Sequence, residues 1–124
     1  QEAVSSYVSV LNDCAYSYAN HWKNAAHLIG DADRAGEIET ALQARKPEQA
    51  FKGAELALMR YAEKLTLSPG DMVEADVAAL RDAGLDDGAI LEANQIICYF
   101  NYVNRSINGL GVTTAGDIVG YYAD

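Results

Sequence analysis

A thiol and an imidazole lie seven residues apart near the start of the chain. Ser17 comes three residues after Cys14, and His21 follows four residues later. On one α-helix these three positions share a face. The thiol would then sit at the helix N-terminus, where the helix dipole favours a thiolate, the nucleophilic form of cysteine. A carboxylate, Glu2, stands twelve residues before Cys14. These four side chains are the candidates for redox or acid–base chemistry.

The spacing places Glu2 close to His21 if a tight turn at residues 12 and 13 joins two antiparallel helices. Glu2 lies roughly 15 Å before that turn and His21 roughly 12 Å after it, at 1.5 Å per residue. We therefore predict a hydrogen bond between the two side chains. Position 17 is one turn from His21 and within reach, whereas Cys14 is roughly 10 Å away along the axis, too far for a direct bond.

Each of these residues also has a structural explanation. Glu2 is a suitable first-turn carboxylate for the helix dipole, free cysteine is often a small buried hydrophobe, and a lone histidine is often a satisfied core residue. Taken singly, each structural explanation outweighs the functional one. Taken together, and with the family spacing described next, they favour a site of functional origin.

The same four positions carry a family resemblance. They resemble the Glu-x11-Cys-x2-Cys-x3-His signature of the AhpD-like alkylhydroperoxidases, within the carboxymuconolactone decarboxylase superfamily, with Ser17 in place of the second cysteine. The stretch 10–16 is similar to that family's approach to the active site. The C-terminal half resembles the peroxidase-related branch in four segments: 61–66, 80–85, 99–105 and 109–112. The resemblance spans nearly the whole chain.

The resemblance implies an all-α AhpD-like fold in which an antiparallel helix pair carries the site. It implies reduction of a hydroperoxide, with a thiol or dithiol as electron donor and no cofactor, in a homo-oligomer that is a trimer or hexamer. In that pattern the second cysteine attacks the peroxide and the first resolves it as a disulfide, while Glu2 and His21 form a proton relay. Ser17 departs from the pattern, because a hydroxyl cannot reduce a peroxide.

Ser17 has two explanations. It is either an engineered or selected change from cysteine, or a natural divergence that leaves Cys14 to act alone through a sulfenic acid resolved by an external thiol. Two further functions stay open: a non-catalytic helical oligomer, and a carboxymuconolactone decarboxylase-like enzyme that uses His21 and Glu2 as acid and base. A Glu2–His21–Ser17 nucleophilic triad is formally possible, but no oxyanion donors can be named for it.

Composition restricts the protein class further. A chain of 124 residues fits one domain, 1–124, and half of its residues are apolar. The net charge of −9 argues against non-specific binding to nucleic acid or an anionic membrane, and no apolar run is long enough to span a bilayer. Two cysteines indicate a reducing compartment, so we expect a cytoplasmic protein. Gln1 is not Met, so we expect a trimmed product lacking upstream helical sequence.

Periodicity predicts helices up to about residue 108 and no strand, and the residues after Gly109 are predicted to be a tail or a docking segment. Gly30 should stop the second helix, and Asp86 should cap the longest one. Asp71 and Glu74 form a candidate capping box, and Gly84 resembles a Schellman stop. The predicted helices cover 2–11, 14–29, 33–44, a segment from 54 to 65, a segment ending at 83, and 87–108.

Several residues outside the four-residue site carry expectations of their own. Cys98 lies among apolar residues and is predicted to be core, and His27 is predicted to lie at the surface or an interface. A polar stripe in the longest helix is either a solvent face or an inter-subunit surface: Asn94, Asn101, Asn104, Arg105 and Asn108. The last segment offers apolar surface for an oligomer contact: Ile118, Val119, Tyr121 and Tyr122.

Overall fold

The computed structural model describes residues 1–120, and within that range it is all-α, as expected. The helices are α1 (Glu2–Leu11), α2 (Ala15–Ile29), α3 (Ala32–Gln43), the 3₁₀ turn η1 (Pro47–Gln49), α4 (Gly53–Leu67), the 3₁₀ turn η2 (Pro69–Asp71), α5 (Glu74–Asp82) and α6 (Asp87–Leu110). The predicted bounds agree with these to within a few residues. Among residues 1–120, none of the helices combines the length and the apolar character that a membrane-spanning helix needs.

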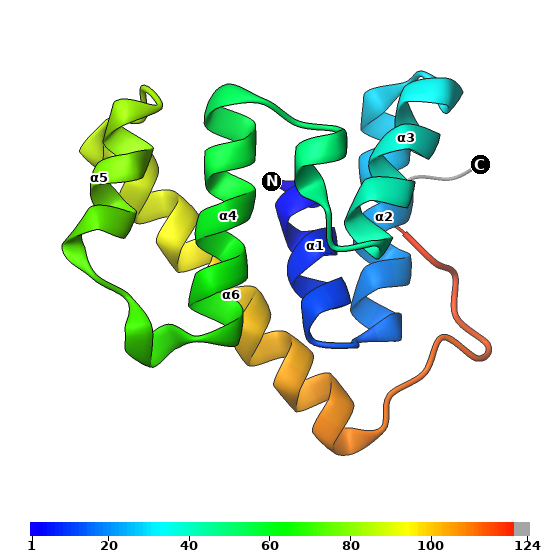
Figure 1. Ribbon diagram of the computed structural model, residues 1–124. Helices are drawn as coiled ribbons and strands as arrows, with labels where there is room; N and C mark the ends of the chain where they lie inside the picture. Colours follow the sequence, from blue (N-terminus) through cyan, green and yellow to red (C-terminus); the bar gives the residue numbers. More distant parts are fainter. Residues whose placement is uncertain (121–124) are drawn as a thin grey trace.

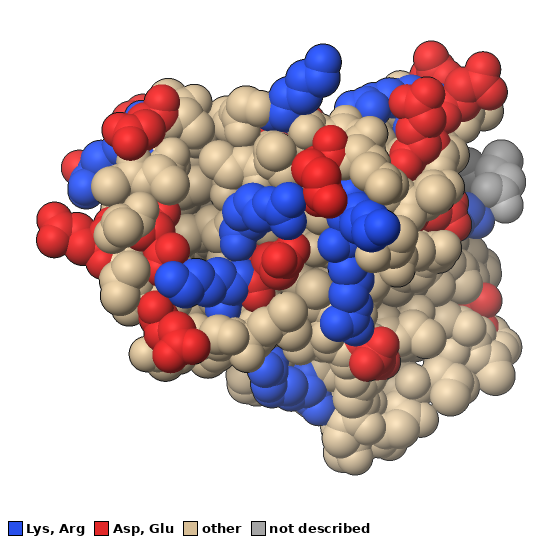
Figure 2. All heavy atoms as spheres, viewed as in Figure 1, with Lys and Arg blue, Asp and Glu red and all other residues tan. Residues whose placement is uncertain are grey.

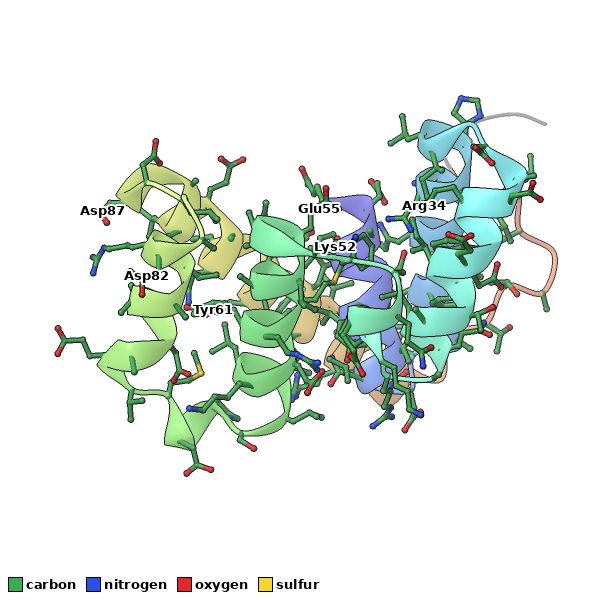
Figure 3. The ribbon with its side chains drawn as sticks, turned by 45° about the horizontal axis from the view of Figure 1, so that its top comes forward. Arg34, Lys52, Glu55, Tyr61, Asp82 and Asp87 are labelled. Atoms are coloured by element: carbon green, nitrogen blue, oxygen red, sulfur yellow. The ribbon has the colours of Figure 1, made fainter. Side chains whose placement is uncertain are left out.

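Helix α1 lies at the centre of the molecule. It forms an antiparallel hairpin with α2, and α4 packs on its other side, while α6 crosses behind both α1 and α4 (Figure 1). Helix α3 covers α2, and α5 packs against α4 and the start of α6. Asp82 and Asp87 mark the corner at which α5 gives way to α6 (Figure 3). The hairpin that carries the candidate site is therefore enclosed by helices from both halves of the chain.

Two apolar clusters meet on α1. Tyr7 joins the cluster formed with α2, α3 and Met59 of α4, whereas the next residue, Val8, joins the cluster formed with α4, α5 and α6. Both side chains are fully buried. Because adjacent residues on a helix point about 100° apart, one short helix contributes to two clusters. The site hairpin is therefore fixed by packing on both sides.

The helix ends follow local chemistry in most places. Gly30 ends α2 in the left-handed conformation, as predicted, with φ at 70°. Asp86 caps α6 by accepting the Ala89 N–H at 2.8 Å. After α5, Gly84 has φ at 102°, and the Leu85 N–H donates to the Leu80 carbonyl at 3.1 Å, which is the Schellman pattern. These three predictions are confirmed.

The predicted capping box of Asp71 and Glu74 is wrong. Asp71 belongs to the 3₁₀ turn η2, and Met72 is extended, so the first residue of α5 is Glu74 itself. The N-cap lies two positions later, at Val73, and the carboxylate at the N3 position is that of Asp76. The carboxylate of Asp76 accepts the Val73 N–H at 2.8 Å and also binds the Lys64 ammonium at 2.8 Å. The extended residue after the turn shifts the helix start beyond the reach of Asp71.

Cys98 is exposed, which corrects the expectation that it is a core residue. The buried face of α6 runs through Ile90, Ile97, Phe100 and Asn104. Cys98 directly follows Ile97 and is turned about 100° away from that face. An apolar sequence neighbourhood therefore does not bury this thiol. His27 is exposed, as expected.

Charged side chains of both signs are interspersed over the face of the molecule seen in Figure 2. Helix α4 forms ion pairs with two other elements: Arg60 with Glu48 of η1 at 2.8 Å, and Lys64 with Asp76 of α5 at 2.8 Å. Tyr61 of the same helix points toward α5 and α6 (Figure 3), where Asn94 donates to its hydroxyl at 2.7 Å. Acidic and basic side chains thus lie next to one another over much of this face.

The segment after α6 runs back alongside α2 (Figure 1). Its Gly120 N–H donates to the Asn20 Oδ1 at 2.9 Å, and Gly120 has a left-handed φ of 85°. A β-carbon at this position would lie 2.8 Å from the Lys23 side chain, so glycine permits the close approach. Ile118 is 91% exposed. Tyr121 and Tyr122 lie outside the described residues.

Candidate functional site

The turn between α1 and α2 places Cys14 at the start of α2. Asp13 adopts a left-handed conformation with φ at 50°, which aspartate tolerates better than most residues. The Cys14 N–H donates to the Ser9 carbonyl at 2.9 Å, and the Cys14 carbonyl accepts the Tyr18 N–H at 3.0 Å. Cys14 is the N-cap residue of α2 and is 1% exposed. The thiol thus sits at the positive end of a helix dipole, as expected.

Glu2 and His21 are in direct contact across the hairpin. The His21 Nδ1 and the Glu2 Oε2 are 2.7 Å apart, so the predicted hydrogen bond is confirmed. With the Glu2 carboxylate as acceptor, Nδ1 carries the hydrogen, and Nε2 is the ring nitrogen left for other partners. The Phe100 ring stands nearly perpendicular to the imidazole, with centroids 4.6 Å apart. The imidazole is therefore held by a carboxylate from α1 and a ring from α6.

Ser17 is buried and bonds to α1, not to His21. Its Oγ is 2.8 Å from the Ser9 Oγ, and only 3% of the residue is exposed. Position 17 was expected to be the group best placed for activation by His21. In the serine form, the hydroxyl is instead occupied by a partner across the hairpin.

A polar stripe on α1 faces the candidate residues of α2. Glu2 and Ser9 are seven residues apart and lie on one side of α1, just as Cys14, Ser17 and His21 lie on one side of α2. In the antiparallel hairpin Glu2 contacts His21 and Ser9 contacts Ser17. Sequence reasoning missed Ser9, although its helical spacing from Glu2 could have identified it.

Three asparagines of the α6 stripe, Asn101, Asn104 and Asn108, bond to the site hairpin. Asn104 is fully buried, and its Nδ2 donates to the Ser9 Oγ at 3.4 Å. The Asn12 Nδ2 donates to the Asn104 Oδ1 at 3.1 Å and to the Asn101 Oδ1 at 3.0 Å. Asn108 donates to the Asn12 carbonyl at 3.0 Å. Part of the stripe therefore joins α6 to the site hairpin. Arg105 and Asn108 are exposed, and the inter-subunit alternative stays a prediction.

Both ends of the site border on hollows in the surface. An open hollow of about 270 Å³ is lined by Ser9, Val10, Asp13, Cys14, Ala15 and Tyr18. At the other end, Glu2 lines a hollow of about 210 Å³ and Phe100 lines one of about 350 Å³. One hollow thus borders the turn that holds Cys14, and another borders Glu2 of the Glu2–His21 pair.

Comparison with known proteins places the fold but not the reaction. No family model matches the sequence, and no match was found among curated proteins. One solved structure, an uncharacterized peroxidase-related protein from Silicibacter sp. TM1040, aligns with a TM-score of 0.80 and 23% identity over 90% of this chain. The chain shares the fold of that protein. It covers 56% of that protein's chain, and at this identity the likeness establishes the fold alone.

Proposed function

We propose that this chain carries a peroxidase-related thiol site of the AhpD-like kind, which reduces hydroperoxides when position 17 bears a thiol. Glu2 and His21 are the proton relay, Cys14 is the resolving thiol, and position 17 is the attacking position. The observation that carries the proposal is the 2.7 Å contact between Glu2 and His21 on the hairpin that also holds Cys14 and Ser17. The shared fold with a peroxidase-related protein supports it.

The reaction follows from thiol chemistry. A thiolate at position 17 attacks the terminal oxygen of the hydroperoxide, the O–O bond breaks, and the sulfur becomes a sulfenic acid. His21 supplies the proton that converts the departing alkoxide to an alcohol. Cys14 then attacks the sulfenic acid sulfur, forming a disulfide and releasing water, and an external thiol or dithiol reduces the disulfide.

Ser17 interrupts this sequence at its first step. An alcohol oxygen is not oxidised by a hydroperoxide, so the chain retains the relay and the resolving thiol but lacks the attacking thiol. We therefore expect little turnover from the chain as it stands. We also propose a homo-oligomeric, cytoplasmic protein, in keeping with the resemblance and the cysteine content.

The buried Ser9–Ser17 hydrogen bond favours a second candidate function, a non-catalytic helical scaffold. The Ser17 hydroxyl is satisfied by Ser9 and takes part in holding α1 against α2. If redox function were lost, position 17 would be left with a structural role as a buried hydrogen-bond partner, as Ser17 has here. The scaffold and the peroxidase predict different outcomes when a thiol is restored.

A hydroperoxide assay with a dithiol donor on three proteins separates the candidates: the chain as given, Ser17→Cys, and Ser17→Cys with His21→Ala. All three carry Cys98→Ser, because Cys98 is an exposed thiol. We expect activity from Ser17→Cys alone, with His21→Ala removing most of it, by roughly 10²–10⁴-fold.

Two results would contradict the proposal. Equal activity of the chain as given and of Ser17→Cys would make Cys14 the working thiol and the role of position 17 wrong. No activity in any of the three proteins would leave the non-catalytic scaffold as the better account.

A further inference from the structure

A chain of hydrogen bonds connects α6 to position 17 through Asn104 and Ser9. The Asn12 amide donates both of its hydrogens, one to Asn101 and one to Asn104. This orients the Asn104 side chain with its oxygen toward Asn12 and its NH₂ group toward Ser9. Ser9 lies between Asn104 and Ser17 and is itself fully buried.

We propose that Ser9, oriented by Asn104, is a positioning residue that directs the side chain at position 17 and donates a hydrogen bond to a thiolate there. This inference rests on the proposed function and names a residue outside the four-residue signature. Glu2 and His21 supply the proton relay, whereas Ser9 supplies the donor that stabilises the charged nucleophile. Through Asn104, helix α6 thereby takes part in the site.

The hydrogen count on Ser9 supports this role. Its hydroxyl has one hydrogen and two neighbouring acceptors, the Ser5 carbonyl at 2.9 Å and the Ser17 Oγ at 2.8 Å. When Ser17 is present, its own hydroxyl can donate to the Ser9 Oγ, and Ser9 can donate to Ser5. A thiolate has no hydrogen to give, so Ser9 must turn its hydrogen toward position 17. The Ser5 carbonyl belongs to the first turns of α1 and keeps its helical backbone partner.

Among the described side chains, that of Ser9 forms the hydrogen bond to the side chain at position 17. The ionisable side chains on the facing stripes of the hairpin are Glu2, Cys14 and His21, and His21 Nδ1 is bound to Glu2. From α6, the group closest to Ser9 is the uncharged Asn104. A hydrogen bond that favours the charged form of an acid lowers its pKa. Loss of the Ser9 hydroxyl should therefore reduce the thiolate fraction at position 17.

The test measures a single thiol at position 17, in a protein carrying Ser17→Cys, Cys14→Ser and Cys98→Ser. Its rate of alkylation by iodoacetamide is followed from pH 5 to pH 10, so the reactivity of that thiol is read without any peroxide turnover. Adding Ser9→Ala should slow alkylation at neutral pH roughly tenfold and shift the profile to higher pH by about one unit. Adding Asn104→Ala should shift it in the same direction by less.

Ser6→Ala is the matched control. Ser6 is as fully buried as Ser9, lies on the same helix, and donates to a backbone carbonyl four residues back, that of Glu2 at 2.8 Å. It does not bond to position 17. A purely structural loss of a buried hydroxyl would affect the two variants alike, whereas a positioning role affects Ser9→Ala alone.

Equal pH profiles for Ser9→Ala and Ser6→Ala would overturn the inference. An unchanged profile with Asn104→Ala beside a shifted one with Ser9→Ala would overturn the part assigned to Asn104. Thermal unfolding of each variant verifies that the fold is kept, and Asn104→Ala supplies the test if Ser9→Ala does not fold. Because alkylation needs no hydroperoxide, the result stands apart from success or failure of the peroxidase assay.

Discussion

Tyr7 is a fully buried residue whose hydroxyl has a charged partner. It donates to the Glu63 Oε2 at 2.5 Å. Burial, and after it the hydrogen bond to Glu63 and the charge of that carboxylate, raise the pKa of the Tyr7 hydroxyl above its usual value near 10. The folded state therefore favours the protonated tyrosine, and this preference links stability to pH.

Replacing Tyr7 with phenylalanine should cost roughly 1–2 kcal/mol in the free energy of unfolding at neutral pH, because a hydrogen bond to a charged group is lost. The raised pKa means that the contribution is present below about pH 10 and is lost as the pH rises further. Urea unfolding should show a smaller difference in the free energy of unfolding between the unchanged protein and Tyr7→Phe at pH 11 than at pH 7. Tyr102→Phe, at a position 72% exposed, is the control. A gap that is absent at pH 7 would refute the stabilising role of this bond.

At the scale of elements, helix α5 depends on one carboxylate. Asp76 binds the Lys64 ammonium of α4 and accepts the Val73 N–H at the start of its own helix. The hydrogen bond with Lys64, and after it the one with the Val73 backbone, lower the pKa of Asp76. One side chain therefore both begins α5 and attaches it to α4.

Asp76→Asn should destabilise the protein at pH 7, since it removes the charge that Lys64 binds. A lowered pKa makes the stabilising contribution present above about pH 4 and progressively lost as the pH falls below that value. The melting temperatures of the unchanged protein and of Asp76→Asn should differ at pH 7 and become nearly equal at pH 2.5. Asp82→Asn, an exposed position at the end of α5, should change neither. Equal melting temperatures at pH 7 would rule out this attachment.

The helices were predictable from sequence where a local signal defines them. Gly30, Gly84 and Asp86 act within one turn of chain, and their effects appear in the structure as expected. The start of α5 was not predictable in this way, because Asp71 forms part of the 3₁₀ turn η2 and does not cap the helix. The exposure of Cys98 was also missed, since it depends on which face α6 presents to α1 and α4.

Within the site, the pairing across the α1–α2 hairpin was predictable because a local turn determines it, whereas the contacts from α6 were not. A two-residue turn fixes the register of α1 against α2, so Glu2 and His21 could be paired from spacing alone. The link from Ser9 through Asn104 to Asn12 depends on how α6 crosses the hairpin, 92 residues away in sequence from Asn12. Long-range crossing geometry is not encoded in local periodicity.

At the scale of the molecule, α6 leaves large apolar side chains in solvent. Tyr99 and Tyr102 are 61% and 72% exposed, and Leu91 and Leu110 are also exposed on this helix. Together with Ile118, they form apolar surface that association between copies would cover.

We therefore predict that the protein is an oligomer at micromolar concentration. Sedimentation velocity should give a mass above that of one chain, and Tyr102→Glu should lower it, because a charge buried in an apolar contact is costly. Glu92→Asp, a conservative change at an exposed position of α6, should leave the mass unaltered. A monomer at micromolar concentration would contradict the prediction.

The account rests on position 17 as the attacking position beside a resolving thiol at Cys14. The most direct measurement is the intact mass of the Ser17→Cys, Cys98→Ser protein after one equivalent of an alkyl hydroperoxide. The account predicts the loss of two hydrogens, the mark of a disulfide between Cys14 and the introduced cysteine, whose i, i+3 spacing permits the roughly 5.5 Å Cα separation that a disulfide prefers. The Cys98→Ser protein that retains Ser17 should keep its mass. Two free thiols remaining in the first protein, or an oxygen added to Cys14 in the second at the same rate, would contradict the account.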